Sequence, residues 1–86
     1  MKQEIINAYN QGKKEHPECI VLISYNESYF SLRDDARKMQ QIAGGHLLRA
    51  TDHEMMPYHA FGAYSLDTIL PKIIRNGNKV LISDIL

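Results

Sequence analysis

The run of residues 19–25 constrains the fold more than any other part of the chain. Its sequence, CIVLISY, is apolar at nearly every position and rich in branched side chains. A run of this length favours a strand over a helix, and the lack of alternation with polar residues indicates that both faces of the strand are covered. The sequence therefore predicts a central strand with other elements packed on both sides.

Two segments before the middle of the chain have the spacing of amphipathic helices. Residues 2–15 gather apolar side chains on one side and stop at Pro17, because the residue before a proline avoids the helical conformation. Residues 32–43 follow Ser31, a predicted N-cap, and precede a glycine pair that can end a helix with positive φ. We expect both helices to pack on the central strand.

The third predicted helix has the clearest pattern. Apolar residues recur at helical spacing from Leu66 to Ile74, with Ser65 as the expected N-cap. Gly77 follows as the expected C-terminal glycine. Pro71 lies inside the pattern, so the helix either kinks there or begins its regular part there.

The remaining apolar segments predict strands. Besides the central strand, these are residues 29–31, 46–50, 54–56 and 79–83. We expect turns at residues 26–28 and 51–53, and a stop of the fourth strand near Pro57. The order of elements predicts an α/β (α+β) fold, a mixed sheet of about four to six strands packed by three helices. The length predicts a single domain, residues 1–86.

Charge and cysteine content exclude several classes of protein. Ten Lys and Arg residues balance ten Asp and Glu residues, which excludes a strongly cationic module that finds nucleic acid by long-range attraction alone. The neutral net charge does not exclude a local basic face. The single Cys19 excludes an internal disulfide and suits a reducing compartment, so we expect a cytoplasmic protein. No apolar run approaches the roughly 20 residues of a membrane span, and no secretory signal is visible.

Catalytic motifs are absent from the sequence. The glycine pair is followed by His46 and not by the lysine of a phosphate-binding loop. No serine lies in a nucleophile turn, and the four histidines lack the spacing of zinc ligands, so we expect surface or hairpin histidines. We predict no enzyme, no metal and no cofactor. A small enzyme stays a third alternative that rests on the histidines and on Asp52 and Glu54 alone.

Aromatic and basic residues indicate a second kind of site. Tyr29 and Phe30 precede a group of basic residues on the second helix and the next strand, namely Arg33, Arg37, Lys38 and Arg49. Together they can grip a sugar-phosphate backbone and stack on bases. In the alternative interpretation, Tyr29 and Phe30 belong to the core and the charges only solvate a helix face.

The order of segments and several strings resemble the N-terminal mismatch-recognition domain of the MutS DNA mismatch repair proteins. Residues 66–77, LDTILPKIIRNG, resemble the family's helix and glycine cap most closely. Further matches are residues 78–84 with a family strand, residues 16–22 with the entry to the first strand, Asp34-Asp35-Ala36 with the start of the second helix, and Pro57 and Phe61 with the loop before the third helix. The resemblance spans residues 3–84 and implies a fold like MutS domain I.

The chain departs from the family where the family recognises a mispaired base. There a Phe-x-Glu tripeptide follows the first strand, with the Phe wedged into the base stack and the Glu hydrogen-bonded to the displaced base. Counted back from the second helix, these positions hold Ser28 and Phe30, with Tyr29 between them. Serine offers too little apolar surface to offset unstacking of roughly a few kcal/mol. The resemblance therefore implies weak DNA binding of doubtful mismatch preference, with these three residues near bases and Arg37 and Arg49 on phosphates.

Two interpretations of function stay open. The first is a DNA-binding module without ATPase activity, since the connector, lever, clamp and ATPase domains of MutS do not fit in 86 residues. The second is that the fold has lost DNA recognition and contacts other protein chains. The neutral charge and the Met55-Met56 pair near a sheet edge favour the second. The lack of a distinct partner surface favours the first.

Overall fold

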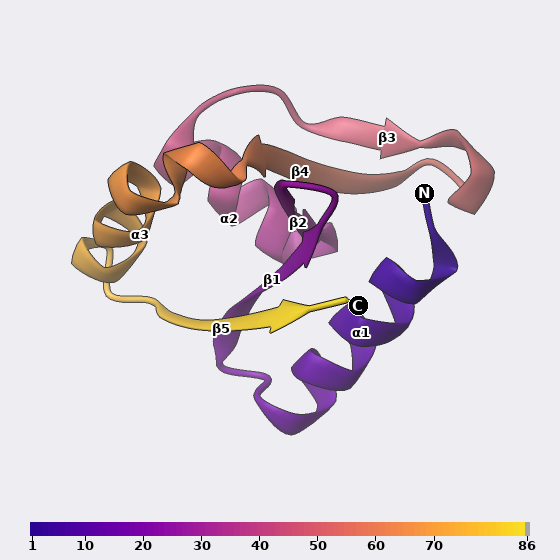
Figure 1. Ribbon diagram of the computed structural model, residues 1–86, viewed down its shortest axis with the longest axis horizontal. Helices are drawn as coiled ribbons and strands as arrows, with labels where there is room; N and C mark the ends of the chain where they lie inside the picture. Colours follow the sequence, from indigo (N-terminus) through magenta and orange to yellow (C-terminus); the bar gives the residue numbers. More distant parts are fainter. Residues whose placement is uncertain (86) are drawn as a thin grey trace.

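The computed structural model in Figure 1 describes residues 1–85. The α-helices are α1 (Gln3–Glu15), α2 (Arg33–Ala43) and α3 (Leu66–Arg75). The strands are β1 (Cys19–Tyr25), β2 (Ser28–Leu32), β3 (Leu48–Ala50), β4 (Met56–Gly62) and β5 (Lys79–Asp84). Two 3-10 turns, η1 (Thr51–His53) and η2 (Ala63–Ser65), follow β3 and β4.

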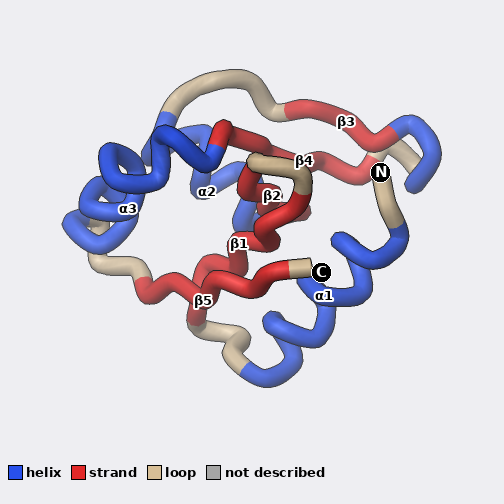
Figure 2. The backbone as a smooth tube through the Cα atoms, viewed as in Figure 1, coloured by secondary structure: helices blue, strands red, loops and turns tan. Residues whose placement is uncertain are grey.

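The strands form one five-stranded mixed sheet in the order β3-β4-β2-β1-β5. β1 runs parallel to β5 and antiparallel to β2, and the remaining pairs are antiparallel. In Figure 2, α3 lies at the left and α1 at the right, with β1, β2 and β5 between them. This architecture confirms the predicted mixed sheet with three helices. No helix within residues 1–85 combines the length and the apolar composition that a membrane span requires.

The central strand is covered on both faces, as its sequence predicts. Val21 and Ile23 lie in a cluster with residues of α1, including Ile5. Ile20 and Leu22 lie in a second cluster, with Met39 of α2 and Ile69 and Ile73 of α3. Each of these four β1 side chains is at most 1% exposed, so each contributes about 1.5–3 kcal/mol of hydrophobic stabilisation. Residue Ile85 packs on the first cluster, and Leu86 lies outside the described residues.

The expected cap of the second helix is wrong. Ser31 lies inside β2 with 1% exposure, and its Oγ has no hydrogen-bond partner. Leu32 occupies the N-cap position of α2 instead. The chain turns directly from strand into helix at Arg33, whose φ is 53°, so no residue is left between the two elements to act as a side-chain cap.

The fourth strand begins and ends later than predicted. Glu54 and Met55, at φ values of 54° and 59°, form the turn after η1 instead of a strand. β4 then continues through Pro57, which pairs with Arg49 of the short edge strand β3. Pro57 and Phe61 therefore lie in β4, not in a loop before α3. A proline is tolerated here because it lies at the start of β4, where the pairing with β2 has not yet begun: β2 pairs only from Tyr58 onward.

The remaining differences are small. Helix α3 begins at Leu66 and contains Pro71, so the alternative that it begins at the proline is wrong. Ser65 is its N-cap residue but makes no side-chain cap hydrogen bond. His59 was expected at the surface or in a hairpin, but it is 3% exposed and its Nε2 lies 2.9 Å from the carbonyl oxygen of Gly44. Because that oxygen only accepts, Nε2 carries the proton.

Candidate nucleic-acid interface

The three residues predicted to lie near bases occupy β2, but they do not share one face. Successive side chains of a strand point to opposite sides, so Tyr29 is separated from Ser28 and Phe30. Tyr29 stacks on Phe61 with ring centroids 5.4 Å apart. Phe30 packs against Tyr58 with centroids 6.3 Å apart. Both rings are half-buried and each already has an aromatic partner.

One hollow of about 350 Å³ collects three of the five predicted site residues. Ser28, Phe30 and Arg49 line it together with Lys2, Ile5, Tyr25 and Tyr58, among others. We call it the aromatic hollow, because three rings form its walls. Lys2 and Arg49 bring two positive charges to a surface that offers stacking area, and Arg49 Nη1 also donates to the Met55 carbonyl oxygen at 3.4 Å. This combination suits a nucleic acid strand.

Asp52 also lines the aromatic hollow, but its charge is compensated. The α-amino group of Met1 lies 2.6 Å from Asp52 Oδ2. That hydrogen bond is the main reason why the pKa of the exposed Asp52 carboxyl is lowered from its usual value. The carboxylate therefore stays ionised and paired, and it leaves the positive charges of Lys2 and Arg49 in excess at the hollow.

Arg37 lies away from the aromatic hollow. Its guanidinium group donates to Asp34 Oδ1 at 2.9 Å on the exposed face of α2. Together with Arg33 it lines a different depression of about 670 Å³ between α1 and α2, which also contains Asp34 and Glu54. The basic residues predicted as one phosphate-contacting group are therefore divided between two places, and Arg37 is already paired.

A second hollow, which shares Asn26 and Ser28 with the aromatic hollow, escaped the sequence analysis. It measures about 540 Å³ and is lined by Asn26, Glu27, Ser28, Gly62, Ala63 and Tyr64. We call it the turn hollow, because the turn between β1 and β2 forms one wall and η2 forms the other. Tyr64 is 93% exposed. No periodicity marks this residue, and only the fold brings η2 beside the β1–β2 turn.

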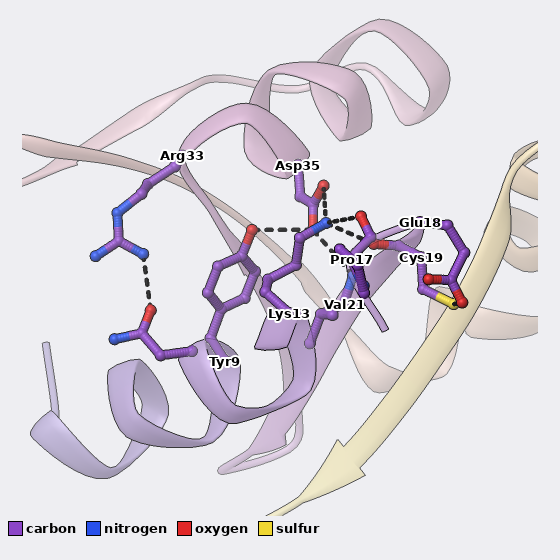
Figure 3. Close-up of polar contacts among 9 residues, drawn as sticks. Tyr9, Lys13, Pro17, Glu18, Cys19, Val21, Arg33 and Asp35 are labelled. Atoms are coloured by element: carbon purple, nitrogen blue, oxygen red, sulfur yellow. Dashed lines mark hydrogen bonds and ion pairs between the residues drawn. The ribbon is translucent and has the colours of Figure 1, made fainter. Parts of the chain in front are cut away.

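The buried Asp35 carboxylate contacts side chains and backbone from several elements, as Figure 3 shows. Asp35 of α2 is 2% exposed and accepts hydrogen bonds from Tyr9 Oη at 2.9 Å and from the Val21 amide at 3.0 Å. Lys13 Nζ lies 3.2 Å from Asp35 Oδ2. We call these four residues the Asp35 network. The sequence analysis named Asp35 only as part of the start of the second helix, whereas the structure makes it the junction of α1, β1 and α2.

Burial and the neighbouring carboxylate raise the pKa of the Tyr9 phenol well above its usual value. Desolvation is the larger cause, and the charge of Asp35 adds to it because a phenolate would lie against a carboxylate. Tyr9 therefore remains protonated and keeps donating its hydrogen bond. Arg33 stands 5.9 Å from the centre of the same ring and also donates to Asn10 Oδ1.

Within residues 1–85, one group of side chains has the geometry to hold a metal ion. Donor atoms of His16, Glu18 and Cys19 lie within 4.8 Å of one another. Structural zinc sites use four ligands, and this group supplies three donor atoms, one fewer than such a site needs. The pKa of the exposed Glu18 carboxyl is lowered, first by a backbone hydrogen bond and then by the nearby charges of His16 and Lys79. The sequence analysis considered the spacing of the histidines and missed this group.

The fold defines a small α+β domain in which one mixed sheet carries helices on both faces. The chain belongs to the MutS domain I family, whose model matches residues 3–85. It is 32% identical over 82 residues to the DNA mismatch repair protein MutS of Salinibacter ruber, covering 93% of this chain. The same protein of Porphyromonas gingivalis is equally similar, at 32% over 82 residues.

The match to these relatives is confined to a small part of each. The chain spans 9% of the length of the Salinibacter ruber and Porphyromonas gingivalis proteins, and 8% of the DNA mismatch repair protein MutS of Phocaeicola vulgatus, to which it is 32% identical over 74 residues. The comparisons confirm the family resemblance predicted from residues 3–84. The activities of these relatives are those of much longer proteins, and assigning any of them to this chain is a proposal.

Proposed function

We propose that this chain is a DNA-binding module of the mismatch-recognition type that holds DNA weakly at the edge formed by the β1–β2 turn. One observation carries the proposal. Lys2 and Arg49 line the aromatic hollow together with Ser28 and Phe30, which the family resemblance aligns with the residues that recognise a mispaired base. The mismatch repair proteins named above support DNA as the partner.

The number of available cations supports weak binding. Lys2 and Arg49 are the basic residues of the aromatic hollow, and the chain as a whole has a net charge of zero. If each contacts one phosphate, the logarithm of the binding constant falls with the logarithm of salt concentration with a slope of about −2. Affinity then lies in the range of non-specific binding, a Kd of about 10⁻⁴–10⁻⁶ M at physiological salt.

The placement of the aromatic side chains supports the absence of a mismatch wedge on β2. A wedge needs a ring that is free to enter the base stack. Phe30 packs on Tyr58 and Tyr29 stacks on Phe61, while Ser28 has no ring. A mispaired base that stays within the stack is therefore bound no better than a paired one. We assign no catalytic step to the chain and no ATPase activity, because its sequence contains no phosphate-binding loop.

Fluorescence anisotropy tests this proposal. Labelled homoduplex, single-mismatch duplex and single-stranded DNA are titrated at about 50 and 200 mM salt. We expect binding that weakens with salt and is equal for the first two DNAs. Substitution of Arg49 by Gln makes the salt slope shallower by about 1, whereas Arg75→Gln, on α3, leaves it unchanged. No binding of any DNA at the lower salt concentration refutes the proposal.

The sheet edge favours a second candidate function, contact with another protein chain. β3 is an edge strand, and Leu48 is 41% exposed and Met55 53% exposed beside it. Met56 is buried, so only one residue of the methionine pair is available at the surface. An extended peptide can add to such an edge. A strict monomer in light scattering, together with DNA binding as above, excludes self-association and favours the first function.

The proposed cellular location is the cytoplasm. Cys19 is a free, buried thiol, and a reducing compartment keeps it so. Localisation of a fluorescent fusion tests this part of the proposal, and export of the fusion contradicts it.

A further inference from the structure

Tyr64 is held out from the protein in a defined place. Its side chain is 93% exposed, more than any other large hydrophobic residue of the described chain. The ring nevertheless lies close over Gly62, because a Cβ at that position would come 2.3 Å from Tyr64 Cε1. The glycine thus makes room for an aromatic ring whose outer surface has no packing partner of its own.

The β1–β2 turn, which forms the other wall of the turn hollow, carries an unusual residue at its second position. Asn26 and Glu27 connect β1 to β2 with φ values of 52° and 61°, the geometry of a two-residue type I′ turn. The second position of such a turn is usually glycine, since a side chain there crowds the backbone. Here it carries an exposed carboxylate. A glycine would adopt the φ of 61° at this position without the crowding that a side chain causes.

A backbone hydrogen bond fixes the two walls relative to each other. The amide of Ala63 donates to the carbonyl oxygen of Glu27 at 2.9 Å. The turn and η2 are far apart in the sequence, yet they are held side by side at the end of β2. The result is a ring, a carboxylate and the polar side chains of Asn26 and Ser28 around one hollow.

We propose that the turn hollow binds one unstacked nucleobase of DNA. The ring of Tyr64 stacks on the face of the base, and the Glu27 carboxylate accepts hydrogen bonds from its edge. Guanine suits the site best, because its Watson–Crick edge offers two adjacent N–H donors to the two carboxylate oxygens. This inference rests on the proposed DNA binding and names the part of the DNA that the site takes.

The distribution of charge argues for a base and against a phosphate in this hollow. Glu27 of the turn hollow repels the backbone, whereas Lys2 and Arg49 of the aromatic hollow attract it. Because Ser28 lines both hollows, a strand can lay its phosphates along the aromatic hollow and turn one base into the turn hollow. Such a base must already be out of the stack, as in a single strand or a bulge.

A single fluorophore reports this contact directly. The chain contains no tryptophan, so Tyr64→Trp introduces the only one. The variant is titrated with a duplex carrying one unpaired guanine, with the matched homoduplex and with a single strand. We expect the tryptophan emission to be quenched by the bulged duplex and by the single strand, and to remain unchanged with the homoduplex.

Substitution of the ring measures its contribution. We expect Tyr64→Ala to lower the affinity for the bulged duplex about 5- to 150-fold, which corresponds to the loss of one base–aromatic stack, and to leave homoduplex affinity unchanged. The matched control is Ile74→Ala, which removes a 54% exposed apolar side chain from α3 and changes neither affinity.

Substitution of the carboxylate tests the edge contact. We expect Glu27→Gln to reduce the preference for an unpaired guanine over an unpaired thymine about 5-fold or more, since each well-placed base contact discriminates by about 1 kcal/mol or more. Glu54→Gln is the matched control, because Glu54 is also exposed and left-handed, with φ 54°.

The outcomes separate this inference from the proposed function. If the protein binds DNA in a salt-dependent way, but Tyr64→Trp emission and Tyr64→Ala affinity do not respond to an unpaired base, the turn hollow takes no base and the proposed function stands. If no DNA binds at low salt, both are wrong.

Discussion

Two carboxylates that flank β2 in the sequence, Glu27 before it and Asp35 after it, differ in burial and in the contacts they make. Asp35 is buried and receives hydrogen bonds from α1 and β1, so every contact it makes also holds the fold together. Glu27 is exposed on a left-handed turn and makes no side-chain contact that the fold requires. The comparison teaches that stability is concentrated in the Asp35 network, while the turn hollow contains residues that the fold alone would not select.

The largest effect should come from removal of the buried carboxylate. Asp35→Ala leaves the Tyr9 hydroxyl, the Val21 amide and the Lys13 ammonium without their common partner. We expect a loss of about 3–5 kcal/mol in the free energy of unfolding, measured by urea denaturation. Asp34→Ala is the control, because the Asp34 side chain is 91% exposed and should change stability by less than about 0.5 kcal/mol. Equal stability of the two variants would disprove the role of the network.

A smaller loss is expected from Tyr9→Phe, which removes one donor from the Asp35 network and keeps the ring. A hydrogen bond to a charged group contributes about 1.5–3 kcal/mol, so stability should fall by that amount at neutral pH. The variant isolates the hydroxyl from the hydrophobic packing of the ring.

The pH dependence of the same variant follows from the raised pKa of Tyr9. The native state binds the phenolic proton more tightly than the unfolded state, whose pKa is about 10. The stabilisation that protonated Tyr9 gives the native state is therefore fully present below pH 10. As pH rises above 10, the free energy of unfolding falls by up to about 1.4 kcal/mol per pH unit. Stability of the wild type should decline more steeply above pH 10 than that of Tyr9→Phe. Parallel curves would contradict this assignment.

The buried pair on β2 and β4 contrasts with the Asp35 network in a different way. Ser31 and His59 are paired residues of β2 and β4, and neither Ser31 Oγ nor His59 Nδ1 has a hydrogen-bond partner. Ser31→Ala removes a hydroxyl that gains nothing from burial, so stability should stay the same or rise by up to about 1 kcal/mol. A loss above about 1 kcal/mol in thermal denaturation would show that the hydroxyl donates to His59 in solution.

Hydrophobic periodicity explains why most of the fold could be predicted from the sequence. The strand at residues 19–25 and helix α3 are defined by side chains that must be buried, and burial leaves a regular pattern. The predicted end of the fourth strand is wrong because a proline indicates a stop, whereas Pro57 lies inside β4. The predicted start is wrong for a different reason. Glu54 and Met55, which form the turn, have no composition that marks a left-handed conformation.

The candidate site was harder to predict, for a related reason. The family resemblance identified Ser28 and Phe30, which do lie at one hollow with Arg49. It gave no indication of Tyr64, because its place beside Glu27 depends on how η2 packs against the β1–β2 turn. Contacts between distant segments leave no local pattern in one sequence, and an exposed ring has no periodic partners.

The smallest effect on stability is expected from Glu27→Gly, which removes the exposed carboxylate of the two. Glycine relieves the crowding at φ 61° and completes the Asn-Gly pair that type I′ turns favour, so we expect stability to rise by about 0.5–1 kcal/mol. The same change should remove the preference for unpaired guanine. Glu54→Gly, at φ 54°, should stabilise the chain similarly and leave DNA binding unchanged. If both substitutions raise stability but only Glu27→Gly removes the base preference, the Glu27 carboxylate is kept for recognition. Natural chains accept local strain where function requires it.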